Sequence, residues 1–183
     1  MYDPEKHHRR SIRLKNHNYD LGFYYVTICC ENRVCILGKI RNKAMILNRY
    51  GEIAQKEWLK TAEIRSNIKL HEFVLMPNHI HGILEITNCG DKADCIGVVG
   101  NRNAETGNLM SDISPKCATL PIIIRAYKSA VSKQMHELGF VGQIWQRNYY
   151  EHFIRNEQSY QAKSQYIIDN PANWNEDEFY IEL

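Results

Sequence analysis

Two histidines after a tight turn are the residues most able to do chemistry. Residues 76–82 read Met-Pro-Asn-His-Ile-His-Gly between two apolar runs. Pro77 and Asn78 favour a turn, because proline fixes φ and asparagine tolerates the third turn position. His79 and His81 then open the second strand of a β-hairpin and share one face, since side chains alternate along a strand. Imidazoles roughly 7 Å apart along a strand could bind one divalent metal ion. The equally simple alternative is two histidines in a half-polar strand.

A tyrosine near the C-terminus has the properties of a nucleophile. Asn156 predicts a helix N-cap, and Pro171 predicts the end of that helix near residues 169–170. Tyr166 lies outside the apolar stripe of this helix, with Asn170 one turn later. The stripe, spaced at about 100° per residue, consists of Tyr160, Ser164, Ile167 and Ile168. A phenol becomes a competent nucleophile when a metal ion or a base stabilises its oxyanion. We therefore expect Tyr166 to attack a phosphodiester and form a covalent phosphotyrosine.

Length and composition are those of one globular domain with little net charge. The chain has 183 residues, 44% hydrophobic and 24% charged, with a formal net charge of +2. Bulk charge therefore gives no argument for nucleic acid. The arm 1–20 is basic, however, and its Arg9, Arg10 and Arg13 could follow a phosphate backbone. A frayed terminus is the open alternative.

The cysteines and the apolar runs predict a reduced, cytoplasmic protein. Six cysteines are present, but no apolar leader precedes them. No apolar run approaches the roughly 20 residues of a membrane span. Cys29 and Cys30 lie in an apolar strand, where free thiols act as small buried hydrophobes.

Periodicity and turn residues predict the remaining elements. Residues 88–116 are rich in Gly, Asn, Asp and Ser, which predicts a mobile insertion or lid. The other predicted elements are a central strand at 23–30, a hairpin-like segment to about 47, a helix over roughly 49–62 capped by Asn48, strands at 69–76 and 79–86, and a helix from Thr119 to Gly139.

Three further residues are candidate DNA contacts. Trp145 and Arg147 belong to the segment 143–150, which mixes aromatic rings with polar donors, a composition suited to stacking on unpaired bases. Lys128 lies in a polar row along the second helix. A packed loop and a solvated helix face are the commoner explanations, and we predict loop structure for Tyr149 and Tyr150.

Taken together, these motifs resemble those of a known family. The run Met-Pro-Asn-His79-Ile-His81-Gly-Ile is followed some 85 residues later by Tyr166-Ile-Ile-Asp-Asn170-Pro on the last predicted helix. A segment from Trp145 to Asn156 precedes that helix. This pattern, which spans about residues 10–175, resembles the HUH single-tyrosine transposases, in particular the branch called REP-associated tyrosine transposases.

The resemblance implies an α+β fold: one domain over residues 1–183, with a ferredoxin-like antiparallel sheet and helices on one face. It implies a Mg²⁺ or Mn²⁺ ion bound by His79, His81 and Asn170. Such proteins cleave and rejoin single-stranded DNA next to hairpins, through a 5′-phosphotyrosine at Tyr166 and a free 3′-OH. The partners would be single-stranded DNA hairpins, with no membrane and with a homodimer left open. The protein would be cytoplasmic, and nucleoid-associated when bound to DNA.

Two other classes of function remain open. The first is a hairpin-binding protein on the same fold that has lost its chemistry and forms no covalent DNA adduct. The second is a zinc hydrolase using His79 and His81, which needs further ligands. His71, His136 and His152 are the histidines available for that purpose. Tight stoichiometric zinc would favour the hydrolase.

Overall fold

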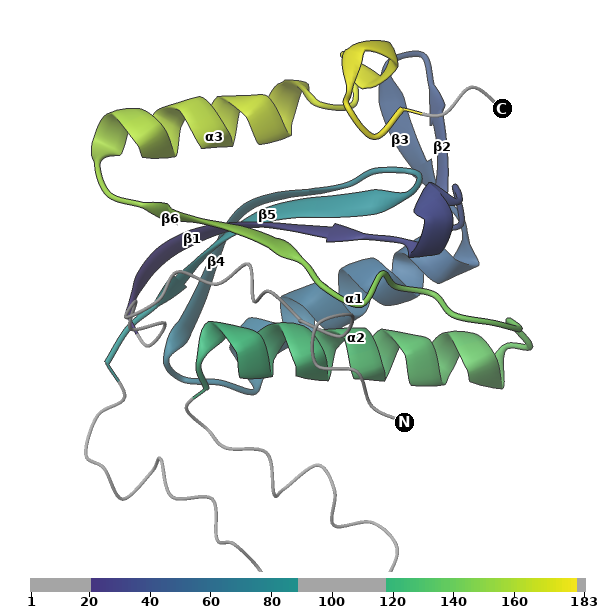
Figure 1. The fold of residues 1–183 in the computed structure, drawn as a ribbon, viewed down its shortest axis with the longest axis horizontal. Coiled ribbons are helices and arrows are strands. Elements are labelled where there is room, and N and C mark those ends of the chain that lie inside the picture. The colour runs from purple at the N-terminus through teal and green to yellow at the C-terminus, as the bar shows by residue number, and fades with distance from the viewer. Residues whose placement is uncertain (1–20, 89–117, 181–183) are drawn as a thin grey trace, which may run out of the picture.

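The computed structural model describes residues 21–88 and 118–180. The basic arm 1–20 and nearly all of the predicted insertion 88–116 lie outside these residues. The described chain contains a four-stranded antiparallel sheet, a separate two-stranded hairpin and three α-helices (Figure 1). The elements are β1 (Gly22–Cys29), β2 (Gly38–Arg41), β3 (Ala44–Leu47), α1 (Arg49–Glu63), β4 (Ile68–Leu75), β5 (His79–Ile86), α2 (Leu120–Glu137), β6 (Tyr150–Ile154) and α3 (Glu157–Asp169), with 3-10 turns at Glu31–Arg33 and Trp174–Glu176.

The topology is ferredoxin-like, as predicted. The four-stranded sheet has the order β4-β5-β1-β6, and every neighbouring pair is antiparallel. In chain order, α1 connects β1 to the β4–β5 hairpin by way of the β2–β3 hairpin, and α2 connects β5 to β6. The α+β fold class is therefore confirmed.

The helices cover both faces of the sheet, which corrects the prediction of helices on one face. α1 and α2 lie on one side, and α3 lies on the other (Figure 1). The larger core, on the α1/α2 side, takes Tyr24, Val26 and Ile28 from β1, whereas the smaller core beneath α3 takes Tyr25 from the same strand. The unbroken apolar run of β1 has a direct explanation, because this strand is buried on both faces.

The predicted turn between β4 and β5 is present and places the two histidines. The backbone N–H of Met76 donates to the carbonyl of His79 at 2.8 Å, which closes the turn at Pro77 and Asn78. Ile80 packs into the core on the α1/α2 side. His79 and His81 therefore face the α3 side, as strand alternation predicts.

Local sequence signals give the helix boundaries correctly. The side chain of Asn48 accepts hydrogen bonds from the N–H groups of Tyr50 and Gly51 at the start of α1. Asn156 does the same for the N–H of Ser159 at the start of α3. Gly139, just past α2, has a φ of +87°, a conformation that glycine adopts without strain.

Two predictions about residues in the C-terminal half of the chain are wrong. Tyr150 does not lie in a loop, because it opens β6, which pairs with β1 at the edge of the sheet. Strands this short with mixed aromatic and polar residues have weak periodicity. Ile168 does not face the core either: it is 60% exposed, because only Ser164 and Ile167 of α3 are buried.

The described residues also bear on two predictions made from composition. None of their helices is long and apolar enough to cross a bilayer. Cys29, Cys30 and Cys35 are free thiols in this part of the chain. Cys29 and Cys30 are buried at the end of β1, as predicted for small hydrophobic side chains.

Candidate active site

The two histidines of β5 are buried side by side under the C-terminal part of the chain. His79 is 0% exposed and His81 is 1% exposed, and their ring centroids are 4.4 Å apart. The Nε2 atoms of both rings are buried and have no hydrogen-bond partner. Buried polar atoms are nearly always paired. Two orphan nitrogens in contacting rings therefore indicate a missing ligand.

Asn78 sets the orientation and the tautomer of His79. Its amide nitrogen donates to the carbonyls of Arg33 at 3.0 Å and Phe179 at 2.8 Å. The amide oxygen of Asn78 must then be the acceptor that lies 2.8 Å from Nδ1 of His79. His79 therefore carries its proton on Nδ1 and presents a lone pair on Nε2, the arrangement found in metal-binding histidines.

Two hydroxyl groups hold His81. Its Nδ1 lies 2.7 Å from the hydroxyl of Tyr25 and 2.8 Å from that of Thr27, both on β1. The ring of Tyr25 also stacks on that of His81, with centroids 5.4 Å apart and planes 22° apart. These contacts engage Nδ1 and leave Nε2 directed at the site.

Burial keeps both imidazoles neutral. Desolvation, together with the nearby charge of Arg33, lowers the pKa of His79 to about 3. Burial also holds the pKa of His81 well below its usual range, and His79 adds to this effect. A neutral imidazole has the lone pair that a metal ion requires.

Asp177, which the sequence analysis did not single out, completes the group. One ligand atom each from His79, His81 and Asp177 lie within 4.8 Å of one another. One carboxylate oxygen of Asp177 accepts from the hydroxyl of Tyr166 at 3.1 Å and from the amide of Asn170 at 2.9 Å. Its other oxygen accepts from the N–H of Phe179 at 2.7 Å.

Tyr166 lies at the edge of this group. It is 42% exposed, and its ring packs edge-on against His81 with centroids 5.3 Å apart. Burial, the charge of Asp177 and its hydrogen bond with the phenol together raise the pKa of Tyr166 to about 12. Without a cation nearby, the phenol therefore keeps its proton at neutral pH.

The donor set fits a divalent metal ion. It offers two neutral imidazole nitrogens, a carboxylate oxygen from Asp177, and the amide oxygen of Asn170, which is buried without a partner. Nitrogen and oxygen ligands of this kind suit Mn²⁺, Mg²⁺ or Zn²⁺. The structure thus brings together the predicted His79, His81, Asn170 and Tyr166.

The predicted DNA contacts are not gathered at this site. Lys128 is engaged within the protein, because its ammonium donates to the carbonyls of Gln146 and Asn148, each at 2.7 Å. Burial lowers the pKa of Lys128 to about 8. Trp145 is 5% exposed, whereas Arg147 is exposed. Arg9, Arg10 and Arg13 lie outside the described residues.

Sequence reasoning missed Tyr25, Thr27 and Asp177 as site residues, and it gave Asn78 only a turn role. Tyr25 and Thr27 are 56 and 54 residues from His81 in the sequence, so no local pattern connects them. The one available signal was alternation along β1, which places both on a single face. For Asp177 the signal was a carboxylate placed shortly after Asn170.

Comparison with known proteins gives one relative along the full length. The chain is 38% identical over 184 residues to an uncharacterized protein of Haemophilus influenzae, covering 99% of this chain and 98% of that protein. The two proteins belong to one family. No family model matches the chain.

Among solved structures, a REP-associated tyrosine transposase bound to a REP hairpin has the same fold. It aligns with a TM-score of 0.58 at 17% identity, covering 90% of this chain and 74% of that one. The expected fold is therefore confirmed. A Deinococcus radiodurans structure aligns at 15% identity over 87% of this chain and 97% of that one, with a TM-score of 0.42, too low to support an inference.

Proposed function

We propose that the protein is a metal-dependent single-stranded DNA endonuclease and transposase that acts through a 5′-phosphotyrosine at Tyr166. One observation carries the proposal. The hydroxyl of Tyr166 shares the carboxylate of Asp177 with Asn170, beside two buried imidazole nitrogens that have no partner. A tyrosine and a metal-ligand set in one site provide a nucleophile and its activator together.

His79, His81 and a carboxylate or amide oxygen from Asp177 or Asn170 would hold the ion. A bound Mg²⁺ or Mn²⁺ would supply Lewis-acid polarisation of the phosphodiester. Asn78, Tyr25 and Thr27 would keep the imidazoles in position, since residues that orient metal ligands commonly affect affinity by 10- to 100-fold, as an order of magnitude.

Tyr166 would carry the covalent step. Its phenolic oxygen forms a bond to phosphorus while the bond from phosphorus to the 3′ oxygen breaks, which leaves a 5′-phosphotyrosine. The departing 3′ oxygen takes a proton from water and becomes the 3′-OH. Asp177 accepts the phenolic proton, because its carboxylate already lies 3.1 Å from that hydroxyl. Attack of a 3′-OH on the phosphotyrosine reverses the reaction and rejoins the strand.

We propose DNA hairpins as the substrate by analogy with the structural relative, which is bound to a REP hairpin. The fold and the site geometry are compatible with this choice. Arg9, Arg10, Arg13 and Arg147 remain predicted DNA contacts, and a homodimer stays open.

The direct test is covalent capture. The protein would be incubated with a pool of labelled single-stranded hairpins and Mn²⁺ and then run on a denaturing gel. We expect a labelled protein–DNA adduct that EDTA prevents and that mass spectrometry maps to Tyr166. An adduct on Tyr149 or Tyr150 would overturn the assignment of the nucleophile, and the absence of any adduct would favour a hairpin-binding protein without chemistry.

Asp177 also strengthens the zinc hydrolase as a second candidate. Two histidines and one carboxylate are the ligand set of several catalytic zinc sites, and these three side chains lie together. Zinc content after purification separates the candidates. Stoichiometric zinc with no DNA adduct would favour the hydrolase, whereas Mn²⁺-dependent adduct formation would favour the transposase.

A further inference from the structure

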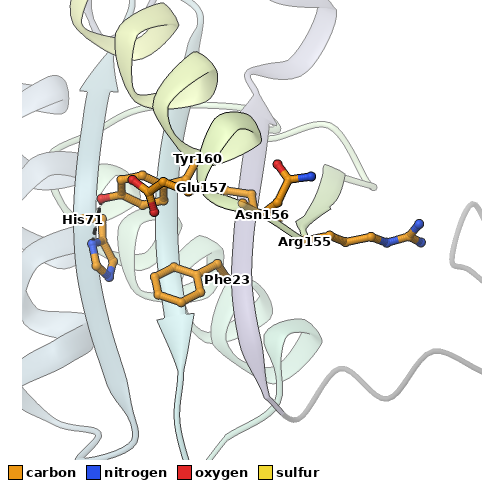
Figure 2. A pocket seen from close by; sticks show the side chains of 7 residues that line it. Phe23, His71, Arg155, Asn156, Glu157 and Tyr160 are labelled. Atoms are coloured by element: carbon orange, nitrogen blue, oxygen red, sulfur yellow. Dashed lines mark hydrogen bonds between the residues drawn. The ribbon is translucent and has the colours of Figure 1, made fainter.

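A cavity lies on the same side of the sheet as Tyr166. It has a volume of about 360 Å³ and lies between the start of α3 and strands β1, β4 and β6. Phe23 and Ile154 supply apolar walls, and His71 and Tyr160 supply further rings (Figure 2). Asn156 and Glu157 add polar groups at the first turn of α3.

The rings in this cavity are held in fixed positions. Phe23 lies 5.2 Å from the ring of His71 and 5.8 Å from that of Tyr160, measured between centroids. The hydroxyl of Tyr160 donates to Glu72 at 2.9 Å and must therefore accept the Nδ1 proton of His71, 3.0 Å away. The Nε2 atom of His71 has no hydrogen bond and lies 3.5 Å from a carboxylate oxygen of Glu85.

Cations connect this cavity to Tyr166. The ammonium of Lys163 lies 4.7 Å from the ring centroid of Tyr25, which contacts His81. No carboxylate among residues 21–88 and 118–180 forms an ion pair with Lys163. Burial lowers the pKa of His152, and the charges of Lys163 and Arg155 lower it further, which places His152 near both cations.

The spacing fits a single strand of nucleic acid. Phe23 and Tyr25 are two residues apart on one face of β1, roughly 7 Å. Tyr160 and Tyr166 are six residues apart on α3, which is a rise of roughly 9 Å along the helix axis. A strand attacked at Tyr166 could therefore place a phosphate near Lys163 and a neighbouring base in the cavity.

We propose that this cavity binds an unpaired nucleobase of the single strand whose phosphate is attacked by Tyr166. Aromatic walls stack on any base, and nearby cations hold the backbone, as in other proteins that bind single strands. A volume near the lower end of ligand pockets, about 300–1,000 Å³, is large enough for one base. The inference rests on the proposed function for its choice of ligand.

Photo-cross-linking tests the cavity without requiring cleavage. The Tyr166→Phe variant, which cannot form the adduct, would be irradiated with random single-stranded oligonucleotides. One pool carries 5-iodouracil and a second carries 8-azidoadenine. We expect cross-links on peptides containing Phe23, His71 or Tyr160. Cross-links confined to other peptides in both pools would overturn the proposal.

Variants then connect the cross-link to the cavity. Lys163→Ala removes the cation near the phosphate, and Glu157→Ala removes a polar group of the cavity. Each should lower the yield at these peptides by about fivefold or more. Lys133→Ala is the matched control, because this cation on α2 is 78% exposed and lies across the sheet. An equal loss of cross-link yield in the control would show general electrostatic binding and overturn the proposal that the cavity binds a base.

The wild-type protein, tested for the Tyr166 adduct with the same pools, separates the two proposals. An adduct without cavity cross-links overturns base binding in the cavity but not the proposed function. Cavity cross-links without any adduct leave a single-strand binding site and overturn cleavage.

Discussion

The two faces of the four-stranded sheet differ in composition and in what they hold. On the α1/α2 side, Ile80, Leu84 and Ile86 of β5 join a large apolar core that also includes Trp58 and Tyr127. On the α3 side, the same strand contributes Ile83 to a core of four buried residues. The remaining positions of β5 on the α3 side are His79, His81 and Glu85.

This difference shows how one strand can serve two purposes. Gly82 faces the α1/α2 side, where an added Cβ would lie 2.6 Å from the indole of Trp58, so the packing there is too tight for a side chain. The α3 side holds the two metal-ligand candidates His79 and His81, whose Nε2 atoms have no hydrogen-bond partner. We infer that the α1/α2 core stabilises the fold and that the α3 side is specialised for chemistry.

The largest effect should come from Tyr166→Phe on the α3 side. The covalent adduct should disappear completely, because the substitution removes only the nucleophilic oxygen. The free energy of unfolding should change by less than about 0.5 kcal/mol, as for most surface changes, since the ring stays half-exposed. Denaturing gels measure the adduct, and urea unfolding measures the free energy of unfolding. Tyr150→Phe is the control. Adduct formation by Tyr166→Phe would show that Tyr166 is not the nucleophile.

His81→Ala should abolish cleavage while largely retaining hairpin binding, because phosphate contacts supply most of the affinity for DNA. Calorimetric titration with Mn²⁺ should show that binding of the ion is lost. His136→Ala, on α2, is the control and should bind Mn²⁺ normally. Unchanged Mn²⁺ affinity in His81→Ala would contradict the metal site.

Leu84→Ala tests the opposite face of the same strand. We expect a loss of about 2–5 kcal/mol in unfolding free energy, because the change leaves a cavity in a tightly packed core. Urea titration measures the loss, and Mn²⁺ affinity should stay unchanged in the protein that remains folded. If the folded Leu84→Ala protein bound Mn²⁺ much more weakly, metal binding on the α3 side would depend on packing on the α1/α2 side.

Asn78→Ala should weaken Mn²⁺ binding by about 10- to 100-fold, because the tautomer of His79 would no longer be fixed. Asn67→Ala is a matched control. Asn67 is also buried and bonds the backbone of Ala118 through both amide atoms, but it lies away from the histidines. Both variants should lose stability, and only Asn78→Ala should lose affinity. Equal affinity in the two variants would contradict the role of Asn78.

Acidification should destabilise the protein through the α3 side. His79 and His81 remain neutral in the folded state but would bind protons near pH 6.5 when unfolded, so their stabilising contribution is present above this pH and lost as the pH falls below it. Each should contribute a slope of about 1.4 kcal/mol per pH unit. Urea titrations from pH 7 to 5 measure the slope, and His81→Ala should reduce it. An unchanged slope in that variant would contradict the buried neutral state.

The sequence predicts what depends on local pattern. Strand alternation places His79 and His81 on one face, and helical spacing places Tyr166 outside the stripe with Asn170 beside it. Capping by Asn48 and Asn156 gives the helix starts. Each of these signals involves residues within one or two turns of one another.

What the sequence does not reveal depends on contacts between distant segments. Asp177 reaches the histidines only because the chain turns back after Asn170, and no periodic signal marks that turn. Lys128 lies in a polar row that resembles a contact surface, yet its ammonium is satisfied by two carbonyls of the 146–148 segment. The apolar run of β1 is consistent with burial on both faces, but which helix covers which face is evident only in the assembled sheet.

The amide of Asn78 has a consequence for the order of folding. It joins Arg33, 45 residues earlier, to Phe179, 101 residues later, and so spans most of the described sequence. Contacts of such high sequence separation form slowly, because loop-closure entropy must be overcome first. The hydrophobic core on the α1/α2 side can therefore form while the C-terminal segment is still free. A folding intermediate of this kind would be compact and secondary-structured, yet chemically incompetent until Asp177 docks.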